Sequence, residues 1–92
     1  MNNVTKIIVK IDESNSKGLS TRRKKRYIKI LNSKCNKMFK TQCITIVKTN
    51  IFKDYIEYIT YGINMSVIHA MYFEINNFKS NIFCANFTVN DV

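Results

Sequence analysis

The sequence predicts a small α+β domain of two layers, with helices on one face of a mainly antiparallel sheet. Short segments that alternate between apolar and polar residues indicate strands near both ends of the chain. A long segment between them repeats its apolar residues with the period of an α-helix. The 92 residues are 46% hydrophobic, which is enough for one core and argues against disorder. We therefore expect one domain over residues 1–92, with the element order β-α-β-α-β-β.

The first two elements follow directly from their residue patterns. Residues 4–11 (VTKIIVKI) are rich in β-branched side chains and predict a strand. Its buried face should carry every second residue: Thr5, Ile7, Val9 and Ile11. A turn-like segment follows, in which Gly18 can adopt a positive φ. Ser20 or Thr21 can cap a helix that runs to Phe39, with an apolar stripe formed by Tyr27, Ile28, Leu31, Cys35, Met38 and Phe39.

The second half of the chain is less clearly patterned. Residues 41–50 predict a strand. The stretch IFKDYIEYITYG (residues 51–62) predicts a helix, because Phe52, Tyr55, Ile56 and Ile59 have helical spacing and Gly62 is a natural C-terminal stop. Residues 63–75 fit both periods. We favour a strand there; a helix would give the order β-α-β-α-α-β. Residues 82–89 would be the hairpin partner of that strand, with one face formed by Phe83, Ala85, Phe87 and Val89.

The strongest functional signal is a run of cations at the start of the first helix. The stretch RRKKR (residues 22–26) opposes the helix dipole, which prefers carboxylates at this end. Locally unfavourable choices of this kind often mark a functional surface. Further cations continue along the side opposite the apolar stripe. The sequence therefore predicts an anion-binding surface, here called the basic helix face: Arg22, Arg23, Lys25, Arg26, Lys29, Lys37 and Lys40.

The overall charge supports the same interpretation. The formal net charge is +9 and the isoelectric point is near 9.7, so the chain attracts nucleic acid and other polyanions. The abundant Ile, Asn and Lys all have A/T-rich codons, so part of the lysine excess reflects genome composition. Such a composition is typical of low-GC bacteria, their phages and plasmids, and certain large DNA viruses.

Several kinds of site are not expected. Cys35, Cys43 and Cys84 are widely spaced among apolar residues and predict free buried thiols. With one histidine in the chain, no usual zinc spacing is present, and we expect no metal site and no cofactor. No apolar run is long enough for a signal peptide or a membrane span. We therefore expect no membrane contact and an intracellular location, which is cytoplasmic, or nuclear in a eukaryotic host.

These observations predict a non-enzymatic binding protein whose basic helix face engages nucleic acid or a host nucleoprotein complex. Composition and size suggest an accessory protein of a virus or mobile element, such as an inhibitor of host defence. One alternative is a protein–protein inhibitor that binds an acidic protein surface. A second is a small metal-independent ribonuclease that uses Lys, Arg and Tyr side chains. Exposed tyrosines could also stack on bases, for which Tyr58 and Tyr61 are better placed than Tyr55 or Tyr72.

Overall fold

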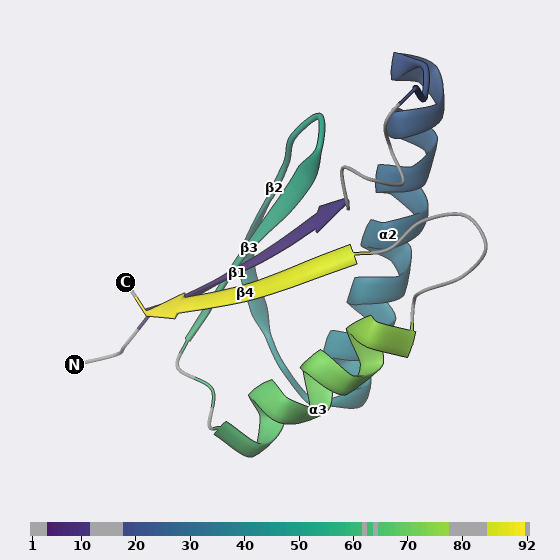
Figure 1. The fold of residues 1–92 in the computed structure, drawn as a ribbon. Helices are drawn as coiled ribbons and strands as arrows, with labels where there is room; N and C mark the ends of the chain where they lie inside the picture. Colours follow the sequence, from purple (N-terminus) through teal and green to yellow (C-terminus); the bar gives the residue numbers. More distant parts are fainter. Residues whose placement is uncertain (1–3, 12–17, 62, 64, 78–84, 92) are drawn as a thin grey trace.

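The computed structural model describes residues 4–11, 18–61, 63, 65–77 and 85–91. Its elements follow one another in the order β-α-β-β-α-β (Figure 1). They are β1 (Val4–Ile11), α2 (Thr21–Thr41), β2 (Ile46–Ile51), β3 (Tyr55–Tyr61), α3 (Met65–Asn77) and β4 (Ala85–Asp91).

The four strands form one sheet in the order β2-β3-β1-β4, and each neighbouring pair is antiparallel. Consequently β1 and β2 run parallel with β3 between them, and β3 and β4 run parallel with β1 between them. These two interleaved β-α-β units are the split arrangement known as the ferredoxin-like topology. The predicted α+β class, with helices on one face of an antiparallel sheet, is confirmed (Figure 1). This topology supports many unrelated functions, so it does not indicate one here.

The core lies between the sheet and the helices. In β1 the odd-numbered residues are buried, as predicted, and in β3 the even-numbered residues Ile56, Tyr58 and Thr60 are buried. Helix α2 contributes five buried residues from its predicted stripe, and α3 contributes Met71. The buried Tyr58 hydroxyl donates a hydrogen bond of 2.7 Å to Oδ1 of Asn32 in α2. The core is formed by Ile7, Val9, Ile11, Ile28, Leu31, Cys35, Met38, Phe39, Ile56, Tyr58 and Met71.

The predicted order of elements in the second half was wrong. Residues 52–61 do not form a helix; the chain turns at Phe52, whose N–H bonds to the carbonyl of Tyr55 at 2.9 Å, and returns as β3. A segment this short fits both the helical period and the two-residue alternation of a strand. As a strand, it places its alternate residues in the core beside β1. The favoured strand over 63–75 was also wrong, because α3 occupies Met65–Asn77. Gly62 lies outside the described residues.

The last strand has a different partner from the one predicted. We expected residues 82–89 to pair with the segment just before them, but β4 pairs with β1. The register sets Ala85, Phe87 and Val89 opposite residues of the buried face of β1. The predicted grouping of these three residues on one face therefore agrees with the register, whereas Phe83 lies outside the described residues. The pairing closes the second β-α-β unit, which short-range sequence patterns do not encode.

Helix α2 ends in a Schellman motif, which explains why β2 begins at Ile46 and not at residue 41. The N–H of Cys43 bonds to the carbonyl of Lys40 at 3.2 Å, and the N–H of Ile44 bonds to that of Phe39 at 2.8 Å. Cys43 has a φ of 58°, a left-handed conformation that glycine usually provides in this motif. The exposed Cys43 side chain therefore adds strain to the cap without packing in the core.

We expect Cys43→Gly to raise the free energy of unfolding by about 0.5–1 kcal/mol. Glycine relieves about 1–2 kcal/mol of left-handed strain, and the larger backbone entropy of the unfolded chain offsets part of this gain. Urea unfolding followed by circular dichroism would measure the change. Cys43→Ala is the matched control, since it removes the thiol but keeps Cβ. Equal stabilities of the Gly and Ala variants would contradict this interpretation of the cap.

Candidate nucleic-acid interface

The first turn of α2 is built from a good cap and unfavourable charges. Gly18 has a φ of 88°, as the turn predicted, and leads into Ser20. The Ser20 hydroxyl caps the helix by accepting a hydrogen bond of 3.3 Å from the Arg23 N–H. The first turn contains no acidic residue, so its cations face the positive end of the helix dipole. Of these, Lys24 pairs with Asp54 of the β2–β3 turn at 3.5 Å.

The basic helix face lies along one helix and is open to solvent. All seven of its residues are exposed. At about 100° per residue, five of them project within roughly 80° of arc, and Arg23 and Lys25 flank them on either side. Their backbone positions span about 27 Å from Arg22 to Lys40, at 1.5 Å per residue. Within the part of the chain that the structure describes, none of the seven side chains forms an ion pair.

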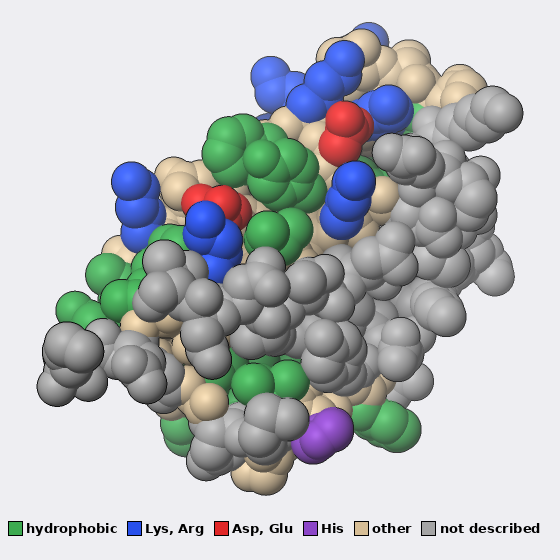
Figure 2. Space-filling model, turned by 60° about the vertical axis from the view of Figure 1, so that its left-hand side comes forward, with side chains coloured by type: hydrophobic (Ala, Val, Ile, Leu, Met, Phe, Trp, Pro, Cys, Tyr) green, Lys and Arg blue, Asp and Glu red, His purple; other side chains and the backbone are tan. Residues whose placement is uncertain are grey.

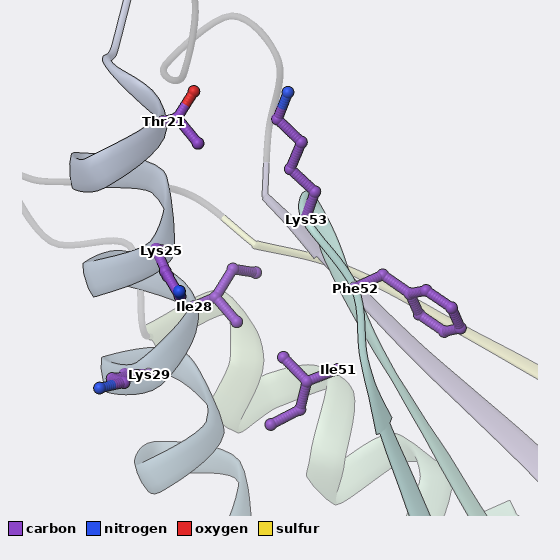
Figure 3. Close-up of a pocket in the computed structure, with 7 residues that line it drawn as sticks. All are labelled: Thr21, Lys25, Ile28, Lys29, Ile51, Phe52 and Lys53. Atoms are coloured by element: carbon purple, nitrogen blue, oxygen red, sulfur yellow. The ribbon is translucent and has the colours of Figure 1, made fainter.

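Two hollows adjoin the N-terminal half of this face. A shallow hollow of about 720 Å³ lies directly among the cations, and its lining is Ser20, Arg22, Arg23, Lys25, Arg26 and Lys29. A second hollow of about 410 Å³, here called the hairpin groove, separates α2 from the turn between β2 and β3. Its lining includes Ile28 and Ile51, with Lys25, Lys29 and Lys53 also present, whereas the Phe52 ring points away from the helix (Figure 3). Both hollows therefore combine cationic side chains with accessible space.

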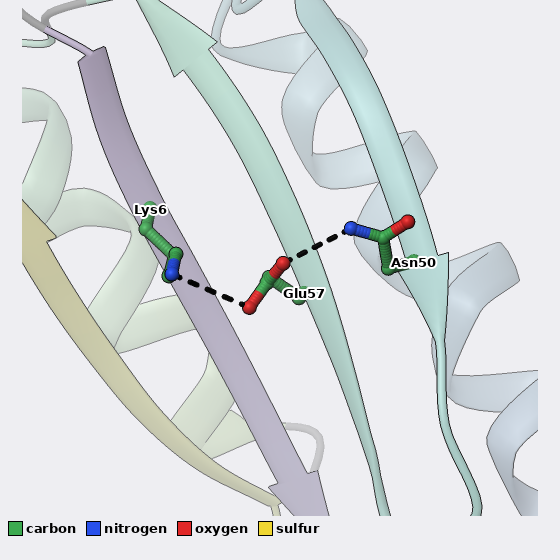
Figure 4. A network of polar contacts seen from close by, with 3 residues as sticks. All are labelled: Lys6, Asn50 and Glu57. Atoms are coloured by element: carbon green, nitrogen blue, oxygen red, sulfur yellow. Dashed lines mark hydrogen bonds and ion pairs between the residues drawn. The ribbon is translucent and has the colours of Figure 1, made fainter. Parts of the chain in front are cut away.

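The sheet surface that faces away from the helices, here called the open sheet face, was missed at the level of sequence. Register places its side chains in two rows across three strands: Lys48, Ile59 and Lys6, then Asn50, Glu57 and Ile8; it also pairs Tyr55 with Lys10. Phe52, in the turn after β2, extends this surface because its ring stacks on Tyr55. Glu57 sits at the centre, where its carboxylate accepts a hydrogen bond of 3.0 Å from the Asn50 amide and pairs with Lys6 at 3.6 Å (Figure 4). Because residues 52–61 were predicted to be helical, no pattern in the sequence analysis grouped these side chains.

The tyrosines are distributed differently from the prediction. Tyr58 is fully buried, so it cannot stack on a base, and its selection as a stacking residue was wrong. Tyr61, at the end of β3, is 54% exposed. Tyr55 is half-buried and lies on the open sheet face, where its ring stacks on Phe52 with centroids 4.6 Å apart. Alternation along β3 thus separates one tyrosine in the core from two on the opposite face.

The remaining predicted features give no further site. Cys35 is a buried free thiol as expected, but Cys43 is exposed, and Cys84 lies outside the described residues. Among the described residues, no group of three His, Cys, Asp or Glu side chains is close enough to hold a metal ion. No helix in the described part of the chain has the length and apolar character needed to cross a membrane.

Comparison with other proteins adds no assignment. No protein-family model matches the chain, and no curated protein shows significant sequence similarity to it. The function must therefore be inferred from the residues of this chain and their arrangement.

Proposed function

We propose that this is a non-enzymatic nucleic-acid-binding protein that docks through its basic helix face. The observation that carries the proposal is the row of seven exposed cations on α2, none of them in an ion pair within the described residues. Cations in the first turn weaken the helix by a few tenths of a kcal/mol each. Their concentration there is explained if they bind an anionic partner.

The dimensions of the face suit a nucleic-acid backbone. A span of about 27 Å corresponds to about eight base-pair steps measured along the axis of duplex DNA, at 3.4 Å per step. The phosphates repeat along the strand, as the cations repeat along the helix. Phosphate contacts of this kind fix position without reading sequence. We therefore expect binding that depends strongly on salt and weakly on base sequence.

The test compares two double charge reversals that lower the net charge from +9 by the same four units. Arg22→Glu with Arg26→Glu changes the basic helix face, and Lys10→Glu with Lys48→Glu changes the open sheet face. Fluorescence anisotropy with a labelled 20-base-pair DNA duplex gives the dissociation constants. With about six phosphate contacts, the slope of log affinity against log salt should be near −5 for the unmodified protein.

We expect the helix double variant to bind the duplex about 60-fold more weakly at 0.1 M salt, because two lost contacts remove about 1.8 from the salt slope. The sheet double variant should stay within a few-fold of the unmodified protein. Unfolding does not explain such a loss, because glutamate at Arg22 favours the helix dipole and leaves α2 at least as stable. Circular dichroism checks this.

Equal weakening by both double variants would mean that only net charge matters, and the proposal would fail. No duplex binding by the unmodified protein even at 20 mM salt would also overturn it and favour an acidic protein partner. Cleavage of RNA by the purified protein would instead support the ribonuclease alternative.

A further inference from the structure

We propose that the open sheet face is a second contact surface, on which Phe52, Tyr55 and Tyr61 stack the bases of a single strand. This inference rests on the proposed function in that it takes nucleic acid as the ligand, and it adds a preference for unpaired nucleotides. It concerns a different layer of the molecule from the basic helix face, so the two surfaces can be tested separately.

The first argument is the exposure of large flat side chains. Phe52 is 44% exposed and Tyr61 is 54% exposed, although both could have been polar on a solvated sheet face. The Phe52 and Tyr55 rings are nearly parallel, with an interplanar angle of 21°. This pair presents a preformed aromatic surface at one end of β3, and Tyr61 provides another at the other end. Grouped apolar exposure of this kind is typical of binding surfaces.

The second argument is the length of the platform. Tyr55 and Tyr61 are six residues apart on one strand and lie on the same face, so their backbones are about 20 Å apart. Half-buried Ile8 and Ile59 lie between them in register. A ligand that uses both aromatic ends must therefore be an extended chain with several flat groups and not a single small molecule.

The third argument is charge. Lys10 lies beside Tyr55 in register, and Lys48 lies beside Ile59. The carboxylate at the centre of the face, Glu57, is paired with Lys6, so it opposes an anion only weakly. Figure 2 shows this side of the molecule, where hydrophobic side chains gather among lysine or arginine side chains. Flat aromatic rings beside cations are the combination that binds single strands without sequence preference.

A single strand fits this face better than a duplex does. In a duplex the flat faces of the bases already stack on one another, so aromatic side chains cannot reach them. The open sheet face projects no helix or loop from the described residues that could enter a groove. Unpaired bases can instead lie on Tyr61 and on the Phe52–Tyr55 pair, while their phosphates approach Lys10 and Lys48.

The test uses a fluorescein-labelled 15-nucleotide oligothymidylate and the corresponding oligouridylate. Phe52→Ala with Tyr55→Ala should weaken binding of both strands by about five- to 150-fold, the range for loss of one stacked base. Phe73→Ala is the matched control, because Phe73 is 70% exposed but lies on α3. Phe52→Tyr with Tyr55→Phe keeps both rings and should bind as the unmodified protein does.

A second experiment is photochemical crosslinking of a strand containing 5-iodouracil to the unmodified protein. Because it needs no variant, a folding defect caused by a substitution cannot affect its result. We expect crosslinks to Phe52, Tyr55 or Tyr61. Crosslinks confined to α2 or α3, or unchanged strand binding by the double alanine variant, would overturn the sheet-face inference alone. If the double alanine variant loses single-strand binding while the helix charge reversal leaves duplex binding intact, the sheet-face inference stands and the proposed helix function fails.

Discussion

Truncation of Phe39 to alanine is expected to lower the free energy of unfolding by about 3–5 kcal/mol. Phe39 is 2% exposed and lies near the end of α2, where it packs against the sheet. Its ring meets the Tyr58 ring edge to face, with centroids 4.7 Å apart and an angle of 75°. Alanine would remove this contact and leave a cavity between the two layers. Because the total free energy of unfolding of a small domain is about 5–15 kcal/mol, the variant should be close to unfolding at 37 °C.

Urea unfolding followed by circular dichroism measures this change, and Phe73→Ala is again the control. Since Phe73 is 70% exposed, its truncation should change stability by less than about 0.5 kcal/mol. A loss below about 1 kcal/mol for Phe39→Ala would show that α2 does not pack on the sheet as described. The position of the basic helix face relative to the open sheet face would then need revision.

The second large effect is a loss of stability at alkaline pH. Burial raises the pKa of the Cys35 thiol from 9.0 to about 12, and a hydrogen bond with Tyr58 lowers it only in part. Burial, followed by the charge of neighbouring Cys35 and a hydrogen bond with it, raises the pKa of the Tyr58 hydroxyl well above its ordinary 10.0. The folded protein therefore keeps protons that the unfolded chain releases. Stability from these groups is fully present below pH 9 and falls as the pH rises toward 12.

We expect the free energy of unfolding to fall by about 2 kcal/mol between pH 9 and pH 11 through Cys35 alone, because the slope reaches about 1.4 kcal/mol per pH unit only once the unfolded thiol is fully ionised. Tyr58 should add about 1 kcal/mol. Urea titrations at pH 7, 9, 10 and 11 would record the decline. In Cys35→Ala the baseline stability changes, but the decline across this range should be smaller by the Cys35 contribution. An identical decline in both proteins would show that Cys35 is not the titrating group.

Sequence reasoning predicted correctly those elements whose residues fit one periodicity, helical or alternating, clearly better than the other. Helix α2 extends over 21 residues, and its stripe returns through several turns, so no strand period fits it. Strand β1 is short but strictly alternating and β-branched. Both predictions needed only the residues within the element. The basic helix face follows from the same periodicity, since side chains opposite a buried stripe must face solvent.

The segment over residues 52–61 shows where this reasoning fails. Its aromatic and β-branched residues satisfy a helical spacing and a strand alternation equally over so few positions. The decision came from outside the segment, because β3 lies between β1 and β2 and exchanges hydrogen bonds with both. The error hid the open sheet face, and it also led to the choice of the buried Tyr58 over the half-buried Tyr55 as a stacking residue.

The sequence by itself determined the α+β class, the long amphipathic helix and the cations along its outer side, since these depend on periodicity within single elements. Only the tertiary structure decided the order β-α-β-β-α-β and the pairing of β4 with β1. It also brought Phe52, Tyr55 and Lys10 together on one surface. The physical reason is that strand pairing joins residues far apart in the chain, and its free energy comes from partners that a local pattern does not identify.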